Sequence, residues 1–162
     1  MSFVVRPAKV EDAEAAVEVV RRSITESCTA DHRGDADTIA TWLANKTVQH
    51  FVSWLTNEDN HCVIAEARDG LLGVGVIQRS GEVVLFYLAP SAQRRGIGKA
   101  IHHALEEKAK DWGLAKLKLD STFLACQFYE KLGYRSVGAA RLRFGMLHSY
   151  PYEKALRMPE VG

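Results

Sequence analysis

The stretch from residue 85 to residue 112 changes its pattern twice within a few residues. It begins as an apolar run, continues through a basic turn that contains two glycines, and ends in a segment with apolar residues at helical spacing. This order indicates a strand that passes directly into an amphipathic helix, and so an α/β type of fold. The turn itself reads Gln93-Arg94-Arg95-Gly96-Ile97-Gly98-Lys99.

Two turn signals in front of this stretch predict further strands. Asp69-Gly70 separates the apolar runs 62–67 and 71–77, which is a strong signal for a β-hairpin. Ser80-Gly81 marks a second turn, and the apolar run 83–88 follows it. The sequence therefore predicts three consecutive antiparallel strands.

The remaining elements complete a mixed α/β order without a linker, a repeat or a low-complexity segment. We expect a mostly antiparallel, twisted central sheet flanked by helices, in one domain over residues 1–162. Glycines at 113 and 133 are expected to end the two helices of the second half. Further expected elements are a strand at 3–6, a helix from Val10 to Ile24, a loop over 25–37 with or without a turn of helix, one or two helices in 38–55, a strand at 117–120, a helix over 123–132, and strands within 134–140 and 144–156.

Composition excludes several classes of protein. With 162 residues, 47% of them hydrophobic, the chain has the length of about one domain and enough apolar residues for a core. A formal charge of +1 predicts neither nucleic-acid nor membrane binding. Three cysteines without a C-x-x-C pair argue against a structural metal, and together with the absence of a signal-peptide pattern they favour the cytoplasm.

Charge is unevenly divided between the two halves of the chain. Residues 1–81 carry 8 Lys/Arg and 12 Asp/Glu, whereas residues 82–162 carry 13 and 8. The glycine turn lies in the basic half. Free backbone N–H groups at a helix N-terminus, together with Arg94, Arg95 and Lys99, favour an anion such as a pyrophosphate. A basic turn without any ligand is the alternative.

Two common phosphate-binding motifs do not fit the turn. A Walker A loop would require Gly at position 93 and Ser or Thr at position 100, where the chain has Gln93 and Ala100. A dinucleotide-binding G-x-G-x-x-G that starts at Gly96 would require Gly at position 101, where the chain has Ile101. A phosphate site at this turn would therefore belong to another class.

Two segments together resemble the GNAT acetyltransferase superfamily. Gln93-Arg94-Arg95-Gly96-Ile97-Gly98 matches its Q/R-x-x-G-x-G/A signature, and Ala125-Cys126-Gln127-Phe128-Tyr129-Glu130-Lys131-Leu132-Gly133-Tyr134 is similar to its A-x-x-F-Y-x-K-x-G-[FY] helix and turn. Both occur in the expected order within the expected strand pattern. The resemblance covers essentially the whole chain, although residues 25–60 match only as generic helical sequence.

The resemblance implies a binding site for acetyl-coenzyme A as co-substrate. The strand before the turn would separate from its neighbour, pair with the pantetheine arm and offer an N–H near Phe86 to the oxyanion. The turn would hold the pyrophosphate through backbone amides, so a side-chain change at Arg94 should weaken binding less than a bulky residue at Gly96 or Gly98. The implied coenzyme-binding residues are Phe86, Leu88, Gln93, Arg94, Arg95, Gly96, Ile97, Gly98 and Lys99.

The resemblance also implies two catalytic residues. Tyr129 occupies the position that often protonates the departing thiolate, and a phenol of pKa about 10 can donate that proton at neutral pH. Glu82 lies eleven residues before Gln93, where histone-type members carry their general base. For Tyr129 the alternative is simple packing, and for Glu82 it is an ordinary hairpin end or a water relay. Members often have Asn where this chain has Leu124, which affects a contact to pantetheine or a water.

The acceptor cannot be named from the sequence. Acidic and aromatic residues in 25–60 would suit a cationic amine. However, Trp42 and Trp54 have core spacing, Asp31 and His32 are expected in a solvated loop, and the buried face of the helix that carries His102 is expected elsewhere. We interpret the chain as an N-acetyltransferase for a primary amine, acting by direct attack in a ternary complex. The alternatives are a non-catalytic coenzyme-sensing or partner-binding module and another nucleotide binder, and both a homodimer and a monomer stay open.

Overall fold

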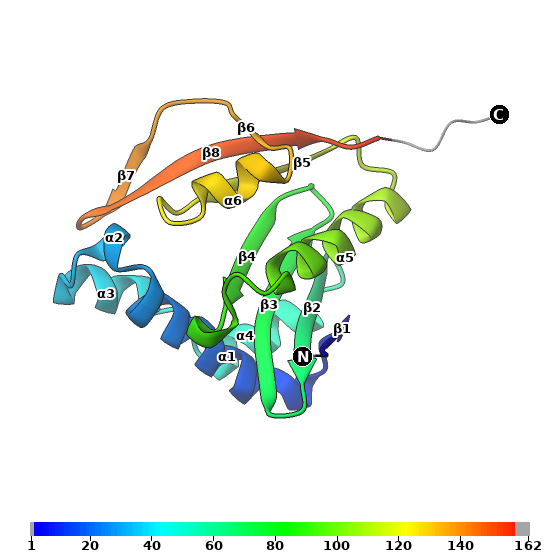
Figure 1. The fold of residues 1–162 in the computed structure, drawn as a ribbon, viewed down its shortest axis with the longest axis horizontal. Helices are drawn as coiled ribbons and strands as arrows, with labels where there is room; N and C mark the ends of the chain where they lie inside the picture. Colours follow the sequence, from blue (N-terminus) through cyan, green and yellow to red (C-terminus); the bar gives the residue numbers. More distant parts are fainter. Residues whose placement is uncertain (1, 158–162) are drawn as a thin grey trace.

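The computed structural model describes residues 2–157, so the outermost residues of the predicted 1–162 domain lie outside it. The first sheet is antiparallel and has the order β1-β2-β3-β4 (Figure 1). The hairpin at Asp69-Gly70 and the turn at Ser80-Gly81 are confirmed, because β2 pairs with β3 and β3 with β4. The strands are β1 (Val4–Pro7), β2 (Asn60–Ala67), β3 (Gly70–Gln78) and β4 (Val83–Leu88).

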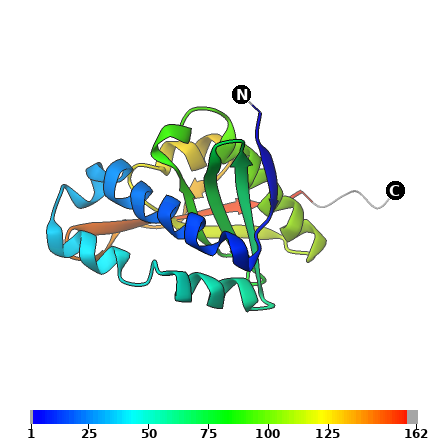
Figure 2. The same cartoon turned by 90° about the horizontal axis from the view of Figure 1, so that it is seen from below.

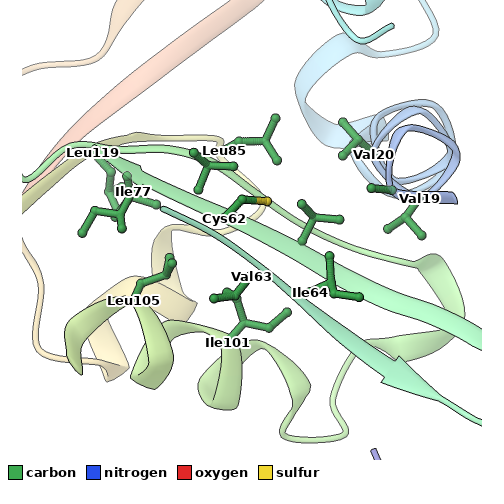
Figure 3. Packing of buried hydrophobic residues seen from close by; sticks show 14 of the residues in the cluster. Val19, Val20, Cys62, Val63, Ile64, Ile77, Leu85, Ile101, Leu105 and Leu119 are labelled. Atoms are coloured by element: carbon green, nitrogen blue, oxygen red, sulfur yellow. The ribbon is translucent and has the colours of Figure 1, made fainter. Parts of the chain in front are cut away.

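Helices cover both faces of this sheet. The close-up in Figure 3 shows Val19 and Val20 of α1 (Ala13–Arg22) on one side of the strands and Ile101 and Leu105 of α5 (Ile97–Asp111) on the other. Figure 2 shows α1 crossing in front of the strands. Smaller helices complete the structure: η1 (Val10–Asp12), η2 (Ser23–Ser27), α2 (Thr29–His32), α3 (Ala36–Leu43), α4 (Val48–Thr56) and η3 (Pro90–Ala92).

Two glycines of β3 bring α5 close to the sheet. A Cβ atom at Gly73 would lie 2.6 Å from Cδ1 of Ile101, and one at Gly75 would lie 2.8 Å from Cγ2 of the same residue. The helix therefore packs directly on the backbone of β3. Since α5 begins at the glycine turn, this close contact fixes where the turn lies relative to the sheet.

The second sheet has the order β5-β8-β6, and β7 also pairs with β8. It meets the first sheet at one parallel bridge between Glu82 and Lys118, where the Lys118 N–H donates to the Gly81 carbonyl at 2.9 Å. Among the described residues, β4 and β5 form no further β-sheet hydrogen bonds beyond this bridge, so the two strands separate. The elements of this part are β5 (Lys116–Ser121), α6 (Cys126–Lys131), β6 (Arg135–Ser136), β7 (Arg141–Phe144) and β8 (Leu147–Ala155).

The predicted fold class is confirmed, but several boundaries were wrong. The expected strand at 134–140 ends at Ser136, because its next partner on β8 is Pro151, which has no N–H to continue the ladder. The expected strand region 144–156 starts earlier and contains two strands, with a turn at Gly145-Met146 between them. The predicted loop 25–37 contains the end of η2 and the single turn of α2, in agreement with the turn of helix that the sequence allowed. No helix of the described residues is long and apolar enough to cross a membrane.

Candidate functional site

The separation of β4 from β5 leaves one edge of β4 open. The Ala89 N–H donates to the Leu72 carbonyl of the β3 strand at 2.8 Å. Since N–H groups alternate between the two edges of a strand, those of Phe86 and Leu88 face the opposite, unpaired edge. Side chains 86–88 are half-buried, whereas Leu85 and Ala89 are buried. The two residues predicted from the resemblance therefore present backbone groups to this open edge, where an extended ligand can add as a strand. The region between the separated parts of β4 and β5 is called the cleft below.

The glycine turn leaves three backbone N–H groups without a partner in the helix. Gly96 precedes the first turn of α5 with φ +78°, and the first helical hydrogen bond of α5 runs from the Ala100 N–H to the Gly96 carbonyl at 3.1 Å. The N–H groups of residues 97–99 therefore project from the helix start, where the helix dipole also favours an anion. Arg94 adopts φ +62°, an uncommon conformation for a residue with a side chain.

Gly98 has a role that the sequence did not reveal. A Cβ atom there would lie 3.0 Å from Cζ of Phe128 and 3.3 Å from Cδ1 of Leu88. Its missing side chain allows α6 and the end of β4 to approach the start of α5. Gly96 differs, because a Cβ atom there would meet nothing within 4 Å. Of the two glycines in the motif, one serves packing and the other serves backbone conformation.

Tyr129 of α6 is buried among aromatic rings. The centroid of its ring lies 6.0 Å from that of Phe86, 5.3 Å from Phe128 and 5.3 Å from Tyr134, each in an edge-to-face arrangement. Only 5% of the residue is exposed, and no hydrogen bond of its hydroxyl group to another described residue is present. Burial raises the pKa of Tyr129, with smaller contributions from Tyr87 and Cys126, so the phenol keeps its proton at neutral pH.

A buried polar chain supports Tyr134, the neighbour of Tyr129. The Tyr134 hydroxyl lies 2.6 Å from Nε2 of His102, whose Nδ1 lies 3.4 Å from the Glu106 carboxylate. Lys154 pairs with the same carboxylate. Burial lowers the pKa of His102 to about 4, so the imidazole is neutral. Its Nε2 atom can therefore accept a hydrogen bond from the Tyr134 hydroxyl. The expectation that the buried helix face lies elsewhere was wrong, because His102 is 2% exposed.

Glu82 lies at the bridge where the two sheets meet. It is half-buried, its carbonyl accepts from the Gln78 N–H at 2.9 Å, and it precedes β4. Phe86, which contacts Tyr129, is four residues further along, about 13 Å at the usual rise per residue of a strand. Glu82 and Tyr129 thus lie toward opposite ends of the cleft.

Asp31 and His32 are buried, so the expectation of a solvated loop was wrong for both. The Asp31 carboxylate accepts from the backbone N–H groups of Phe123 at 2.6 Å and Leu124 at 3.3 Å. These bonds fix the turn that precedes α6 against α2. Burial raises the pKa of Asp31. Nδ1 of His32 accepts from the Gly34 N–H at 2.9 Å, so Nε2 donates to the Ile24 carbonyl at 3.0 Å.

Two residues of helix α3 form hydrogen bonds with β4 and with the β7–β8 turn. Trp42, confirmed as a core residue, donates from Nε1 to the Tyr87 hydroxyl at 3.1 Å. The Thr38 hydroxyl accepts from the Met146 N–H of the β7–β8 turn at 3.0 Å. Together with Asp31, these residues connect the segment α2–α3 to β4, to the β7–β8 turn and to the loop before α6. Figure 1 shows α2 and α3 at the end of the molecule near this hairpin.

A pocket of about 270 Å³ lies between these segments. It receives residues from α2, from the loop that precedes α6 and from the β7–β8 hairpin. Asp31 belongs to the acidic residues of 25–60 that would suit a cationic amine, although it was expected in a solvated loop; the other lining residues were not predicted as site residues. The lining residues are Ala30, Asp31, Arg33, Phe123, Met146, His148 and Tyr150.

The sequence matches a family model described as an acetyltransferase (GNAT) domain over residues 26–156. A Bacillus subtilis (strain 168) protein with the provisional name of an acetyltransferase is 33% identical over 79 residues, which are 49% of this chain and 54% of the relative. That alignment therefore spans about half the length of the curated relative.

Solved structures share the fold at low sequence identity. A GCN5-related N-acetyltransferase from Rhodopseudomonas palustris superimposes with a TM-score of 0.84 at 21% identity, covering 96% of this chain and 97% of that one. The PaiA N-acetyltransferase from Thermoplasma acidophilum in complex with coenzyme A gives a TM-score of 0.80 at 22% identity, covering 96% and 100%. The ribosomal-protein-S18-alanine N-acetyltransferase from Escherichia coli gives 0.72 at 17% identity, covering 99% and 97%. With the family model covering most of its length, the chain belongs to the GNAT acetyltransferase family.

Proposed function

We propose that the protein transfers an acetyl group from acetyl-coenzyme A to a primary amine by direct attack in a ternary complex. The observation that carries this proposal is the open edge of β4, which leads straight to the free N–H groups at the start of α5. An extended amide chain that ends in a pyrophosphate fits such an arrangement. Coenzyme A has this combination of parts, and the family membership supports it.

The coenzyme would lie along the cleft with its phosphates at the turn. Backbone N–H groups of Gly96, Ile97, Gly98 and Lys99 would hold the pyrophosphate, with added positive charge from Arg94, Arg95 and Lys99. Gln93 begins the turn and would help to shape it. The backbone of Phe86 and Leu88 would pair with the amides of the pantetheine arm. This orientation brings the thioester to the part of the cleft beside Tyr129.

The reaction then needs three groups. The amine nitrogen attacks the thioester carbonyl, a C–N bond forms, and the N–H of Phe86 stabilises the oxyanion. The C–S bond breaks, and Tyr129 donates its proton to the thiolate. Burial raises the pKa of Tyr129, so the hydroxyl group carries its proton across the neutral range, which is the state that a general acid requires. Glu82 would take the proton that the amine loses, with water to span the distance along β4.

The role of Tyr129 is tested by Tyr129→Phe. We expect turnover, measured as thiol release, to fall about 100-fold or more, the usual contribution of a general acid, while the affinity for acetyl-coenzyme A stays the same. Tyr152→Phe, at a buried tyrosine of β8, is the matched control. Unchanged turnover in Tyr129→Phe with every active acceptor would remove Tyr129 from the mechanism.

Glu82 is tested by Glu82→Gln, with Glu58→Gln as an exposed control. We expect only the first change to lower turnover, most strongly at low pH, where the acceptor amine carries its extra proton. Equal turnover in both variants would show that a water relay, and not Glu82, takes the proton that the amine loses. If coenzyme A binds and no amine in a broad panel releases thiol, the protein is a coenzyme-sensing module; tighter binding of ATP than of coenzyme A would assign it to another class of nucleotide binder.

A further inference from the structure

The pocket beside α2 combines one buried negative charge with aromatic walls. The Asp31 carboxylate is 6% exposed and is fixed by the N–H groups of Phe123 and Leu124. Ring centroids of Phe123 and Tyr150 lie 6.0 Å apart. A carboxylate next to aromatic faces is a favourable environment for an ammonium group, which gains from both the charge and the ring quadrupoles. This end of the pocket therefore suits the amine of an acceptor.

A positive charge faces the same pocket. Arg33 lies two residues after Asp31 and has a left-handed backbone with φ +52°. It lines the pocket, is exposed, and its guanidinium forms no ion pair with any residue of the described range 2–157. A guanidinium group binds a carboxylate through two parallel hydrogen bonds, and it repels a second ammonium group. The two formal charges of the pocket therefore complement a zwitterion better than a polyamine.

Apolar side chains occupy the rest of the wall. Phe123 is 58% exposed and Met146 is 39% exposed, values that are high for residues of this size in a folded protein. Both line the pocket. Its volume of about 270 Å³ lies just below the range of roughly 300–1,000 Å³ that drug-sized ligands occupy. A small molecule with one apolar side chain would cover these residues.

The pocket is also linked to the proposed reaction centre. Phe123 belongs to the loop that leads into α6, the helix that carries Tyr129. The Tyr87 hydroxyl of β4 accepts from Nε1 of Trp42 at 3.1 Å, so the segment α2–α3, part of which lines the pocket, also contacts β4. The pocket wall thus connects to both elements of the proposed reaction centre, α6 and β4.

We propose that this pocket binds a free α-amino acid with an apolar side chain as the acetyl acceptor. Its amine lies toward Asp31, its carboxylate binds Arg33, and its side chain packs against Phe123 and Met146. This assignment rests on the proposed function, because it names the acceptor of the same reaction. Arg33 is then the residue that distinguishes amino acids from amines without a carboxylate.

The experiment compares matched acceptors with the full chain in a thiol-release assay. L-Phenylalanine, phenethylamine, L-alanine and 1,5-diaminopentane differ in the carboxylate, the apolar side chain or a second ammonium group. We expect kcat/KM for L-phenylalanine to exceed that for phenethylamine and for the diamine by at least tenfold. The kcat/KM for L-alanine should lie between that for L-phenylalanine and those for the two amines, because L-alanine keeps the carboxylate but lacks the large side chain.

Arg33→Gln supplies the second measurement. It should lower kcat/KM for L-phenylalanine about tenfold, mainly through KM, and leave phenethylamine unchanged. Arg33→Lys should restore part of the loss, since it keeps the charge without the planar fork. Arg68→Gln, at an exposed arginine of the β2–β3 turn, is the control and should behave as the wild type. Melting temperatures of all variants show whether each is folded.

Several results would overturn the assignment. A preference for the diamine or for phenethylamine would do so, and so would an Arg33→Gln variant that weakens all acceptors equally. In both cases thiol release still occurs, and the proposed acetyl transfer stands. Thiol release with none of these acceptors but with a polyamine or a lysine peptide would also overturn the amino-acid assignment alone. Binding of coenzyme A without thiol release from any amine would overturn the proposed function itself.

Discussion

Replacing Gly96 by Ala tests whether the proposed binding of coenzyme A at the glycine turn depends on the backbone conformation of Gly96. At Gly96 φ is +78°, and a Cβ atom would meet nothing within 4 Å, so the substitution introduces strain but no collision. A left-handed residue with a side chain costs about 1–2 kcal/mol relative to glycine. The strained turn populates other conformations that do not bind the coenzyme. The apparent dissociation constant then rises in proportion to the loss of the binding conformation. An energy of about 1–2 kcal/mol corresponds to a roughly 5- to 30-fold weaker affinity for coenzyme A.

Two further variants separate this effect from general destabilisation. Asn tolerates the left-handed region better than Ala, so Gly96→Asn should lose only a fraction of the affinity. Gly113 at the far end of α5 has φ +76° and the same open surroundings. Gly113→Ala should therefore lower the free energy of unfolding by a similar amount without weakening the binding of coenzyme A. Affinity is measured by titration calorimetry with coenzyme A, and stability by urea unfolding. The reasoning fails if Gly96→Ala binds like the wild type, or if Gly113→Ala weakens binding as strongly.

Three other predictions concern the surroundings of the cleft. Gly75→Ala places a Cβ atom 2.8 Å from Ile101 and should lower the free energy of unfolding by about 1–3 kcal/mol; a urea midpoint equal to that of the wild type would contradict the close packing of α5. Burial lowers the pKa of His102 from 6.5 to about 4, so the unfolded chain takes up this proton first. Stability should fall by about 3 kcal/mol as the pH decreases from about 6.5 to 4, and His102→Gln should lack this component; parallel stability profiles of both proteins would refute it. A double-mutant cycle of Trp42→Phe and Tyr87→Phe should give a coupling free energy of about 0.5–1.5 kcal/mol for their hydrogen bond, and additive losses would show that the bond contributes nothing.

Elements with local signals could be predicted from the sequence. The β2–β3 hairpin follows from Asp69-Gly70, and α5 follows from apolar spacing that stops at Gly113. These signals are local because turn conformation and helix ends depend on neighbouring residues. The turn at 93–99 belongs to the same group, since its glycines and charges are adjacent in the chain.

Features that depend on distant partners could not be predicted. Asp31 reads as a loop residue, and only the fold brings it to the N–H groups of Phe123 and Leu124, about ninety residues away. His102 reads as a surface residue of a helix because its partner Tyr134 comes from another element. The packing role of Gly73 and Gly75 could not be predicted either, since nothing near them in the sequence shows that α5 lies on them.

The hydrogen bonds made by three residues of α2 and α3 affect how such a chain can diverge. The glycine turn belongs to residues 93–99 and to the packing beneath α5, whereas the pocket wall comes from α2, the loop before α6 and the β7–β8 hairpin. Substitutions at Arg33, Met146 or His148 change that wall without altering a residue of the turn. Asp31, Thr38 and Trp42 are different, because each also holds an element of the cleft. If the pocket binds the acceptor as we propose, the range of acceptors can change through substitutions in the first group. The second group limits how far the pocket can change before the elements around it are displaced.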